Sequence, residues 1–308
     1  MAKHIIIDLG TANTKIFDVG NADKGLIFSS PSVVAADKET GRVIAVGTDA
    51  KNLMGREPAK ISVITPIKSG VISDFEAATA MLKIFLTSAV PRGTLRPRAD
   101  IIIPVGATDM EQRTLKEAAE RSGVKVQKIT QSPMAAAASA NLETDAPFGN
   151  MILDIGAGLV TAAVVSFGGV VCAATSHFAG NEMDKSIKEY IKKNFNVTIG
   201  IKTAEEIKCA VGAAHPAIPS NEICVLGRDN TSGLPKEITV TSDEVRSAIA
   251  PVLSGICDTV RSALENTPAE LTCDLSERGI TLCGGGASLP GLSQFLQENI
   301  GLSAGVSS

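Results

Sequence analysis

Short runs of apolar residues alternate with longer stretches of helical periodicity along the whole chain. Residues 5–7 and 99–105 have the length and composition of buried strands, whereas apolar residues between 75 and 86 and between 183 and 191 recur at the spacing of one helix face. Strands that alternate with helices are typical of the α/β class, in which at least part of each sheet is parallel. The pattern therefore predicts an α/β fold.

Polar residues at the predicted element ends support these assignments. Thr108 and Glu111 have the spacing of a capping box, in which each side chain accepts a hydrogen bond from the other residue's backbone N–H group. Ser242 is expected to cap a long helix in the same way. Residues 220–241 are expected to form a hairpin whose loop spans 227–235.

Two strand–turn–strand segments are variations on one theme. The first spans 4–17 and the second spans 151–165; each has an apolar strand that ends in Asp-Leu-Gly or Asp-Ile-Gly, a turn of small residues, and a second apolar strand. Asp8 and Asp154 are 146 residues apart (154 − 8). One such turn is an ordinary hairpin. Two in the same context predict related halves whose hairpins face each other and hold the phosphates of one nucleotide.

The turns carry the groups that such a ligand needs. An aspartate at the end of a buried strand is costly unless its charge is used. Carboxylates suit a hydrated Mg²⁺ ion, and the N–H groups left free by a turn of small residues suit phosphate oxygens. We therefore expect Asp8 and Asp154 to act on Mg²⁺ through water molecules. The expected phosphate-binding residues are Gly10, Thr11, Ala12, Asn13, Gly156, Ala157 and Gly158.

Composition narrows the function classes. The chain has 308 residues, of which 44% are hydrophobic, so it can bury a sizeable core, and its length favours two domains. Its 29 basic and 33 acidic residues argue against a protein that coats nucleic acid. The six cysteines form no C-x-x-C pair, so we expect buried thiols in a reducing cytosol and no zinc site. No signal peptide or membrane span is expected, because Asp154 and small residues interrupt the most apolar stretch, 151–174.

Beyond the twin hairpins, many short motifs resemble the MreB family, the bacterial homologues of actin. The similarity runs in chain order from about residue 4 to about residue 300. So many collinear motifs are far more specific than any single glycine-rich loop. The matching segments are 8–14, 31–34, 47–52, 70–74, 133–137, 179–184, 203–205, 233–236 and 264–268.

The resemblance implies an actin-like ATPase fold of two lobes around a nucleotide cleft. The lobes would span 1–145 and 146–308, each with a core and a peripheral subdomain, at about 32–68 and 181–240. The family binds ATP and Mg²⁺ in the cleft. Its members are cytoplasmic and associate with themselves into filaments at the inner face of the membrane, where they organise wall-synthesis proteins and determine cell shape. We expect the same partners here.

The resemblance also implies roles for two elements that have ordinary explanations on their own, a solvated helix face and a glycine-rich turn between a strand and a helix. In the family, these elements border the adenosine on opposite sides. The residues at these positions are Glu205, Glu206, Ile207 and Lys208 on the helix, and Gly284, Gly285, Gly286 and Ala287 after the strand.

The chain departs from the family at the positions that handle water. The family's connecting segment usually reads Glu-Glu-Pro, and here it is Gln131-Ser132-Pro133, so the carboxylate that would orient or activate water is missing. Gln131 and Ser132 are therefore degenerate catalytic candidates. Serine cannot act as a base near neutral pH without help, and Gln131 could position water only if it points into the cleft.

The second turn departs as well. The family usually has Asp-Ile-Gly-Gly-Gly-Thr-Thr-Glu, whereas this chain has Leu159, Val160 and Thr161 in place of the two threonines and the glutamate. Leu159 and Val160 cannot hydrogen-bond a phosphate. Ala157, which replaces a glycine, would cost on the order of 1 kcal/mol if its backbone needed a positive φ. Since a positioned base contributes roughly 10²–10⁴ in rate, we expect ATP binding with weak or absent hydrolysis.

The expected membrane contact lies in the loop 91–97. This loop has one large apolar residue, where many relatives have two or carry an amphipathic helix at the amino terminus. Its basic residues and their neighbour, Arg92, Arg96 and Arg98, would meet anionic lipid.

Two alternatives remain open. A nucleotide-binding adaptor that modulates another filament without polymerising would share all of these sequence features. A sugar- or acetate-kinase-type enzyme would share the twin hairpins, but it would need a catalytic base beyond Asp8 and Asp154, and the collinear motifs count against it.

Overall fold

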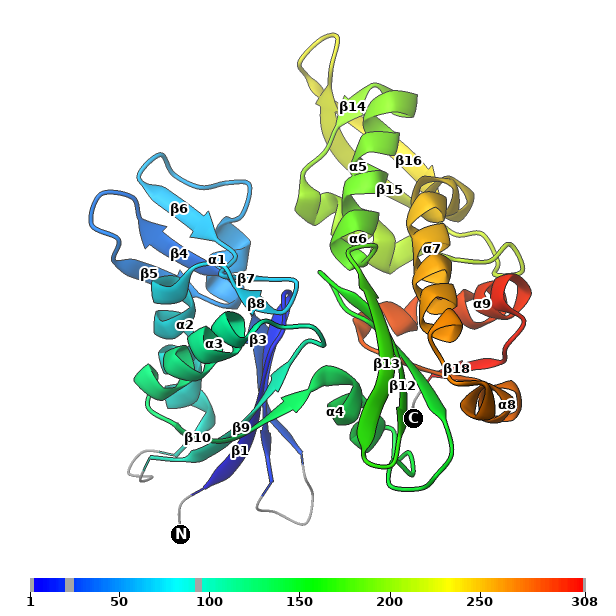
Figure 1. Cartoon of the computed structure of the whole chain (residues 1–308). Coiled ribbons are helices and arrows are strands. Elements are labelled where there is room, and N and C mark those ends of the chain that lie inside the picture. The colour runs from blue at the N-terminus through cyan, green and yellow to red at the C-terminus, as the bar shows by residue number, and fades with distance from the viewer. Residues whose placement is uncertain (1–2, 20–24, 92–95, 307–308) are drawn as a thin grey trace. The chain divides into compact units, whose positions relative to one another are not determined.

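The computed structural model of the chain (Figure 1) describes residues 3–19, 25–91 and 96–306. The chain divides into two compact units, Met1–Ala135 and Ala136–Ser308. The sequence places this division later, after residue 145. In the structure it falls inside helix α4 (Ser132–Ser139), which directly follows the last strand of the first unit.

A five-stranded sheet forms the core of the first unit. In spatial order its strands are β10 (Lys125–Gln131), β9 (Arg98–Ile103), β1 (His4–Leu9), β2 (Asn13–Asp18) and β3 (Leu26–Pro31). β10, β9 and β1 are parallel, whereas β2 and β3 continue the sheet in antiparallel fashion. Ile5, Ile7 and Leu9 are buried because alternate residues of β1 face the core. The carboxyl ends of the three parallel strands therefore lie at one edge of the sheet.

Two helices pack beside this sheet (Figure 1). They are α2 (Phe75–Ala89) and α3 (Asp109–Arg121). The capping box predicted for α3 is confirmed, because Thr108 accepts a hydrogen bond from the Glu111 N–H group and the Glu111 side chain accepts one from the Thr108 N–H group. Met81, Leu82 and Phe85 of α2 enter the core at the predicted helical spacing.

A smaller sheet and a short helix follow β3. The sheet has the order β5 (Val43–Val46), β4 (Val34–Asp37) and β6 (Ile61–Ile64), and the helix is α1 (Thr48–Leu53). Val33, Ala35 and Ala50 form a separate small core in this region. A hairpin of β7 (Ile67–Lys68) and β8 (Val71–Ile72) precedes α2.

The core sheet of the second unit has the same plan. In spatial order its strands are β13 (Gly169–Ser176), β12 (Val160–Ser166), β11 (Asn150–Ile155), β17 (Ile280–Cys283) and β18 (Ala304–Val306). β11, β17 and β18 are parallel, and β12 and β13 are antiparallel to their neighbours. Each unit thus has an antiparallel hairpin beside parallel strands, and the two similar hairpins of the sequence occupy corresponding places.

Helices and a second small sheet complete this unit. The helices are α5 (Gly180–Phe195), α6 (Ile201–Val211), α7 (Ser242–Glu265), α8 (Ala269–Arg278), the 3-10 helix η1 (Gly285–Ser288) and α9 (Leu292–Ile300). α7 lies against β12 and β13 (Figure 1). The small sheet has the order β14 (Val197–Thr198), β15 (Glu222–Asp229) and β16 (Pro235–Thr241).

Two predicted boundaries in this unit are wrong. Thr241, not Ser242, caps α7, and it forms a capping box with Glu244. Ser242 is buried and its hydroxyl exchanges hydrogen bonds with the Asn221 backbone, so it is not available as a cap. The hairpin loop is also shorter than predicted, because β15 and β16 pair as far as Arg228 and Pro235.

The cysteines differ from expectation. Only Cys257 and Cys283 are buried; Cys172 is partly buried, and Cys209, Cys224 and Cys273 are exposed. The apolar runs that suggested burial are strands or helices with one solvent-facing side, which a run of residue types does not reveal. Within the described ranges, no helix has the length and apolar character that crossing a membrane requires.

Candidate functional site

The first hairpin turn, residues 10–13, follows β1 and includes Asn13, the first residue of β2. Asp8 lies opposite Lys15 in the strand register, so both side chains share one face of the hairpin. A Cβ atom at Gly10 would lie 2.6 Å from the Asn13 carbonyl oxygen, so only glycine fits this tight turn.

Asp8 carries an electrostatic cost that points to a cation. Burial raises the pKa of Asp8 above its ordinary value of 3.8, and the nearby positive charge of Lys15 opposes this shift only in part. A carboxylate that is costly to ionise in the free protein gains most from a bound cation. Asp8 therefore fits the predicted Mg²⁺ position.

Ser32 donates hydrogen bonds to two carbonyl groups of the first turn. Its hydroxyl donates to the Gly10 carbonyl (2.7 Å), and its N–H group donates to the Ala12 carbonyl (2.9 Å). In a trans peptide the C=O of one residue and the N–H of the next point in opposite directions. The N–H groups of Thr11 and Asn13 therefore point away from Ser32, where a phosphate can accept hydrogen bonds.

The second turn, residues 156–159, connects β11 and β12 in the same way. The Gly156 N–H donates to the Leu159 carbonyl (2.9 Å), and a Cβ atom at Gly156 would lie 3.0 Å from that oxygen. Asp154 lies opposite Thr161, as Asp8 lies opposite Lys15. The predicted correspondence between the hairpins therefore extends to the register.

The segment just before α5 and its first turn support the second hairpin. The Gly180 N–H donates to the Gly156 carbonyl (3.1 Å), and the Asn181 N–H donates to the Ala157 carbonyl (2.7 Å). The His177 Nδ1 atom lies 3.4 Å from the Gly158 carbonyl oxygen. These supporting residues were not predicted as site residues, because backbone contacts between distant segments leave no mark in residue types.

The glycine run lies beside the second aspartate. Gly284 follows β17, which is parallel to β11, and its φ is 80°. A Cβ atom there would lie 2.4 Å from Asp154 Oδ1 and 2.5 Å from the Ile155 carbonyl oxygen. A Cβ atom at Gly286 would likewise meet the Ile155 side chain. Gly285 is exposed, and Ala287 is buried. The structure thus brings the run and the second hairpin together.

The predicted adenosine residues on α6 differ in their environments. Ile207 has no exposed surface and belongs to the core, so its side chain is unavailable to a ligand. Glu206 is exposed and Glu205 is partly buried. Lys208 Nζ donates to the Gly180 carbonyl (3.0 Å) and lies 2.7 Å from Asp184 Oδ1. Helical periodicity alone places Ile207 on the core face, because Ala204 and Val211 share that face.

The degenerate catalytic candidates lie at the edge that carries the first turn. Gln131 is the exposed last residue of β10, and Ser132 is the partly buried first residue of α4. Gln131 aligns with Ile103, and Asp8 aligns with Ile102 on the intervening strand. Two strand spacings correspond to about 10 Å between the β1 and β10 backbones.

Two expectations about the second turn are corrected. Val160 is fully buried in the core cluster of this unit, so its side chain does not face a phosphate. The register places it on the core face with Ile155. Ala157 is not among the described residues with positive φ, so its replacement of glycine carries no backbone strain. The departures that remain at the turn are Leu159 and Thr161.

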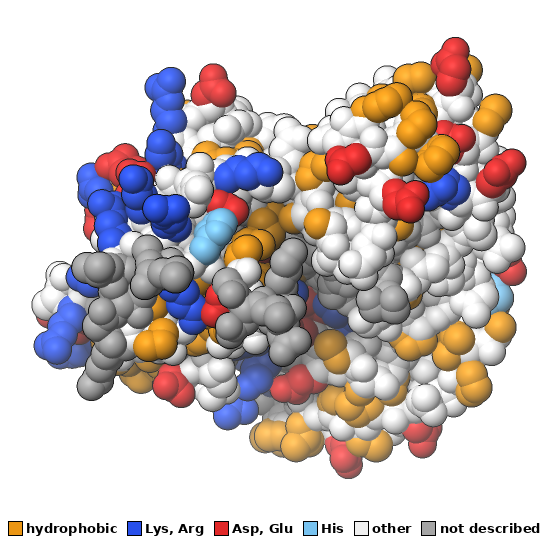
Figure 2. Space-filling model, turned by 90° about the horizontal axis from the view of Figure 1, so that it is seen from below, with side chains coloured by type: hydrophobic (Ala, Val, Ile, Leu, Met, Phe, Trp, Pro, Cys, Tyr) orange, Lys and Arg blue, Asp and Glu red, His pale blue; other side chains and the backbone are white. Residues whose placement is uncertain are grey.

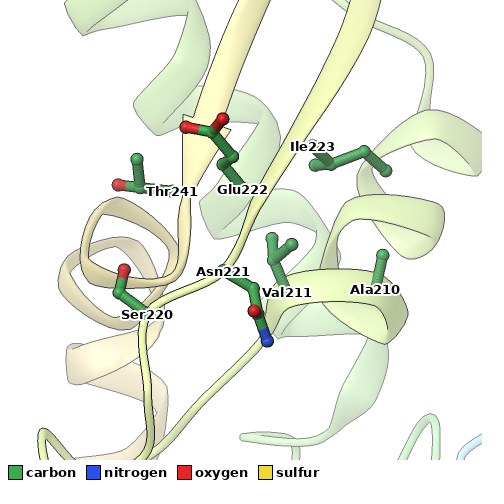
Figure 3. Close-up of a pocket in the computed structure, with 7 residues that line it drawn as sticks. All are labelled: Ala210, Val211, Ser220, Asn221, Glu222, Ile223 and Thr241. Atoms are coloured by element: carbon green, nitrogen blue, oxygen red, sulfur yellow. The ribbon is translucent and has the colours of Figure 1, made fainter.

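Neither a cluster of metal-ligating side chains nor the cavity of the second unit is a stronger candidate for a ligand site than the hairpin turns. Within the described ranges, no group of three or more His, Cys, Asp or Glu side chains could hold a metal ion, so Mg²⁺ would depend on water and phosphate oxygens. The second unit has a cavity of about 550 Å³ lined by Ala210, Val211, Ser220, Asn221, Glu222, Ile223 and Thr241. In Figure 3 the polar side chains of Glu222 and Asn221 point in opposite directions, so they do not converge on a ligand.

Comparisons with known proteins identify close relatives over the whole length. The family described as MreB/Mbl protein matches residues 2–308. The cell shape-determining protein Mbl of Bacillus subtilis (strain 168) is 43% identical over 300 residues, which are 97% of this chain and 89% of that protein. The cell shape-determining protein MreB of Escherichia coli (strain K12) is 40% identical over 302 residues, which are 96% and 86%.

A solved structure agrees with these sequence matches. MreB 5 of Spiroplasma citri bound to AMPPNP has a TM-score of 0.94 and 33% identity, over 100% of this chain and 92% of that chain. The same protein bound to ADP gives the same values. The predicted resemblance and the actin-like α/β fold are therefore confirmed.

Proposed function

Because the chain belongs to the MreB/Mbl family, we propose that it is a cytoplasmic cytoskeletal protein that binds ATP and Mg²⁺ and assembles into filaments that determine cell shape. The names of the relatives support the cell-shape role. The AMPPNP- and ADP-bound structures of a relative support the nucleotide. The observation that carries the proposal is the pair of corresponding hairpins. Each has an aspartate before a turn whose carbonyl groups accept hydrogen bonds from a distant segment of the same unit.

The turn amides and the two aspartates divide the work of binding. The N–H groups of Thr11 and Asn13 in the first turn, and those of residues 157–159 in the second turn, donate to phosphate oxygens. Asp8 and Asp154 hold water molecules of the hydrated ion. Mg²⁺, when bound, neutralises part of the phosphate charge. The exposed backbone of Gly284 and Gly285 leaves room for a planar group to approach.

We further propose that hydrolysis is slow or absent. Ser132 occupies the position of a carboxylate that would activate water, and its hydroxyl is a poor base. The side chain of Leu159 has no hydrogen-bonding group to offer at the second turn. A positioned general base is worth roughly 10²–10⁴ in rate, so its loss at Ser132 alone accounts for weak turnover.

Calorimetry and phosphate release on one sample test this proposal. We expect the protein to bind ATP with Mg²⁺ and to release phosphate at least about 100-fold more slowly than an MreB or Mbl relative assayed beside it. Absence of nucleotide binding would contradict the proposal as a whole. Turnover equal to that of the relative would contradict only the loss of hydrolysis and would direct attention to Gln131.

Filament formation separates this proposal from the adaptor alternative. Electron microscopy with ATP should show filaments at protein concentrations where the relatives polymerise. Monomers at high concentration, with nucleotide bound, would favour a non-polymerising adaptor. The kinase-type alternative loses ground because the family match covers the whole chain.

Membrane and wall-synthesis contacts form the final part of the proposal. Lysine and arginine side chains gather on the surface that Figure 2 shows for the first unit. Arg98 is exposed, whereas Arg96 donates to the Val124 carbonyl (2.9 Å) and is partly engaged. Arg92 lies outside the described residues. Co-sedimentation with anionic vesicles should occur for filaments, and Arg98→Ala should weaken it; filaments that stay in the supernatant would contradict the membrane contact.

A further inference from the structure

Three successive carbonyl groups of the second turn are approached from one side by a single short segment. Gly156 and Ala157 accept hydrogen bonds from the N–H groups of Gly180 and Asn181, at 3.1 and 2.7 Å. The imidazole of His177 reaches the third carbonyl, that of Gly158, with Nδ1 at 3.4 Å. We call residues 177–181 the turn clamp.

The clamp fixes the direction of the turn's amides. Because C=O and the following N–H point in opposite directions in a trans peptide, binding of the carbonyls of residues 156–158 directs the N–H groups of residues 157–159 away from the clamp. The side chains of residues 156–159, Gly-Ala-Gly-Leu, contain no hydrogen-bond donor. The second turn therefore offers a phosphate its backbone amides alone, and their orientation depends on the clamp.

Lys208 holds the clamp in place from α6. Its ammonium group donates to the Gly180 carbonyl (3.0 Å) and pairs with Asp184 (2.7 Å). The side chains of Lys208 and Asp184 are 17% and 7% exposed, so the pair is largely removed from water, and the cost of desolvation offsets much of the attraction between the charges. A cation at the amino end of α5 is also unfavourable with respect to the helix dipole. Local stability therefore gives little reason for Lys208 to be here.

Phe178 anchors the clamp on the other side. Its ring lies on Gly255 of α7, where a Cβ atom would be 2.3 Å from the ring. Gly255 is buried in the helix, and its missing side chain provides the seat for the ring. The clamp is thus attached to α6 through Lys208 and to α7 through Phe178, two contacts that are chemically independent.

We propose that Lys208 is a positioning residue for nucleotide binding, which acts by holding the turn clamp and not by touching the nucleotide. The inference rests on the proposed binding of ATP at the hairpin turns. It reassigns a residue whose position in the sequence suggests direct contact with the adenosine. It also connects the second turn to α5 and α6, which contact the small sheet of β14, β15 and β16.

The test compares ADP and AMPPNP affinities of variants by calorimetry, with the melting temperature measured without nucleotide. Lys208→Met should weaken both nucleotides about tenfold, because misplaced binding groups lose affinity steeply. Lys208→Arg, which keeps the charge and the donors, should recover most of the loss. Phe178→Ala should weaken binding in the same direction although no charge is changed. The matched control is Lys185→Met, an exposed lysine on the outside of α5, which should bind as the parent does.

The possible outcomes distinguish a positioning role of Lys208 from direct contact with the nucleotide and from a protein that does not bind nucleotide. If Lys208→Met lowers affinity but Phe178→Ala does not, Lys208 contacts the nucleotide directly and the positioning role is overturned. If neither variant changes affinity, the clamp is irrelevant to binding. If Lys208→Met does not fold, Phe178→Ala decides alone. Failure of the unmodified protein to bind either nucleotide would instead contradict the proposed function, independently of Lys208.

Discussion

The two hairpin turns share a backbone but differ in what their side chains offer. Both have a glycine packed against a carbonyl three residues later, and both follow a strand that carries an aspartate. The first turn adds the hydroxyl of Thr11 and the exposed amide of Asn13. At the corresponding places the second turn has Ala157 and Leu159. The backbone geometry that we propose to bind phosphate is present at both turns, and polar side chains are present at one.

The groups that donate hydrogen bonds to the carbonyls of the two turns also differ. Ser32 supports the first turn with its own hydroxyl, which is also 3.0 Å from the buried Thr14 hydroxyl. The place of Thr14 is taken by Val160 in the second hairpin, whose support consists of helix-terminal amides. A turn can therefore keep its backbone geometry without polar side chains. The proposed combination of ATP binding with slow or absent hydrolysis rests on this difference between the turns.

The largest expected effect comes from restoring the two positions at which the chain departs from the family. The variant Ser132→Glu with Leu159→Thr should raise phosphate release by about 100-fold, because it supplies a carboxylate at the start of α4 and a hydroxyl at the second turn. Phosphate release under multiple turnover is the measurement, with each single substitution as a control. Unchanged release by a variant that still binds ATP would show that the difference between the turns does not limit hydrolysis.

Glycine substitution tests whether the first turn carries more of the binding. Gly10→Ala places a Cβ atom 2.6 Å from a backbone oxygen, whereas Gly156→Ala leaves 3.0 Å. We expect nucleotide affinity to fall about 100-fold for Gly10→Ala and about tenfold for Gly156→Ala, because the shorter contact forces a larger displacement of the turn and of its amides.

Gly169→Ala is the control for this pair, because a Cβ atom there meets nothing within 4 Å. Calorimetry with ADP is the measurement. A larger loss for Gly156→Ala than for Gly10→Ala would reverse the comparison and make the second turn the main phosphate site.

Local patterns in the sequence were sufficient for much of the fold. Alternating burial in β1 and the capping box at Thr108 follow from strand and helix periods and from one side-chain hydrogen bond. The cap of α7 was misplaced by one residue, because both Thr241 and Ser242 have suitable side chains. Only the tertiary contact of Ser242 with Asn221 distinguishes them.

The sequence points to residues that carry chemistry, but it does not reveal the contacts that support them. Asp8, Asp154 and the glycine run are recognisable from residue types, and the structure places Asp154 beside Gly284. Ser32 was not predicted as a site residue, and Lys208 was predicted only as a neighbour of the adenosine. Both donate to backbone carbonyls far away in the sequence, and no spacing rule reveals these contacts. Val160 shows the opposite error, because a strand residue next to a turn faces the core or the ligand according to the register.

A smaller effect, on stability, is expected when Thr14 and Val160, the corresponding buried residues after the two turns, are each replaced by the other's residue type. Val160→Thr places a hydroxyl among fully buried apolar side chains and should lower the free energy of unfolding by about 1–3 kcal/mol. Thr14→Val should cost less, because the Ser32 hydroxyl keeps the Gly10 carbonyl as a partner. Denaturant unfolding without nucleotide measures both. Equal costs would show that the second hairpin tolerates a polar residue here, and Val160 would again be a candidate for the loss of hydrolysis.

The smallest effect is a change in how stability depends on pH. Burial raises the pKa of Asp8, so above that raised pKa the carboxylate is ionised in both states and its burial destabilises the fold. As the pH falls through the raised value toward 3.8, the folded state takes up a proton before the unfolded state does, and this penalty is relieved. Asp8→Asn should therefore be more stable than the parent at neutral pH without ligand, and the difference should disappear in acid. The same variant should bind Mg²⁺-nucleotide more weakly, which would mean that the first hairpin retains a destabilising charge for the sake of its ligand. The exposed Asp145→Asn is the control, and a parent that is more stable than Asp8→Asn at neutral pH would show that Lys15 already compensates the charge.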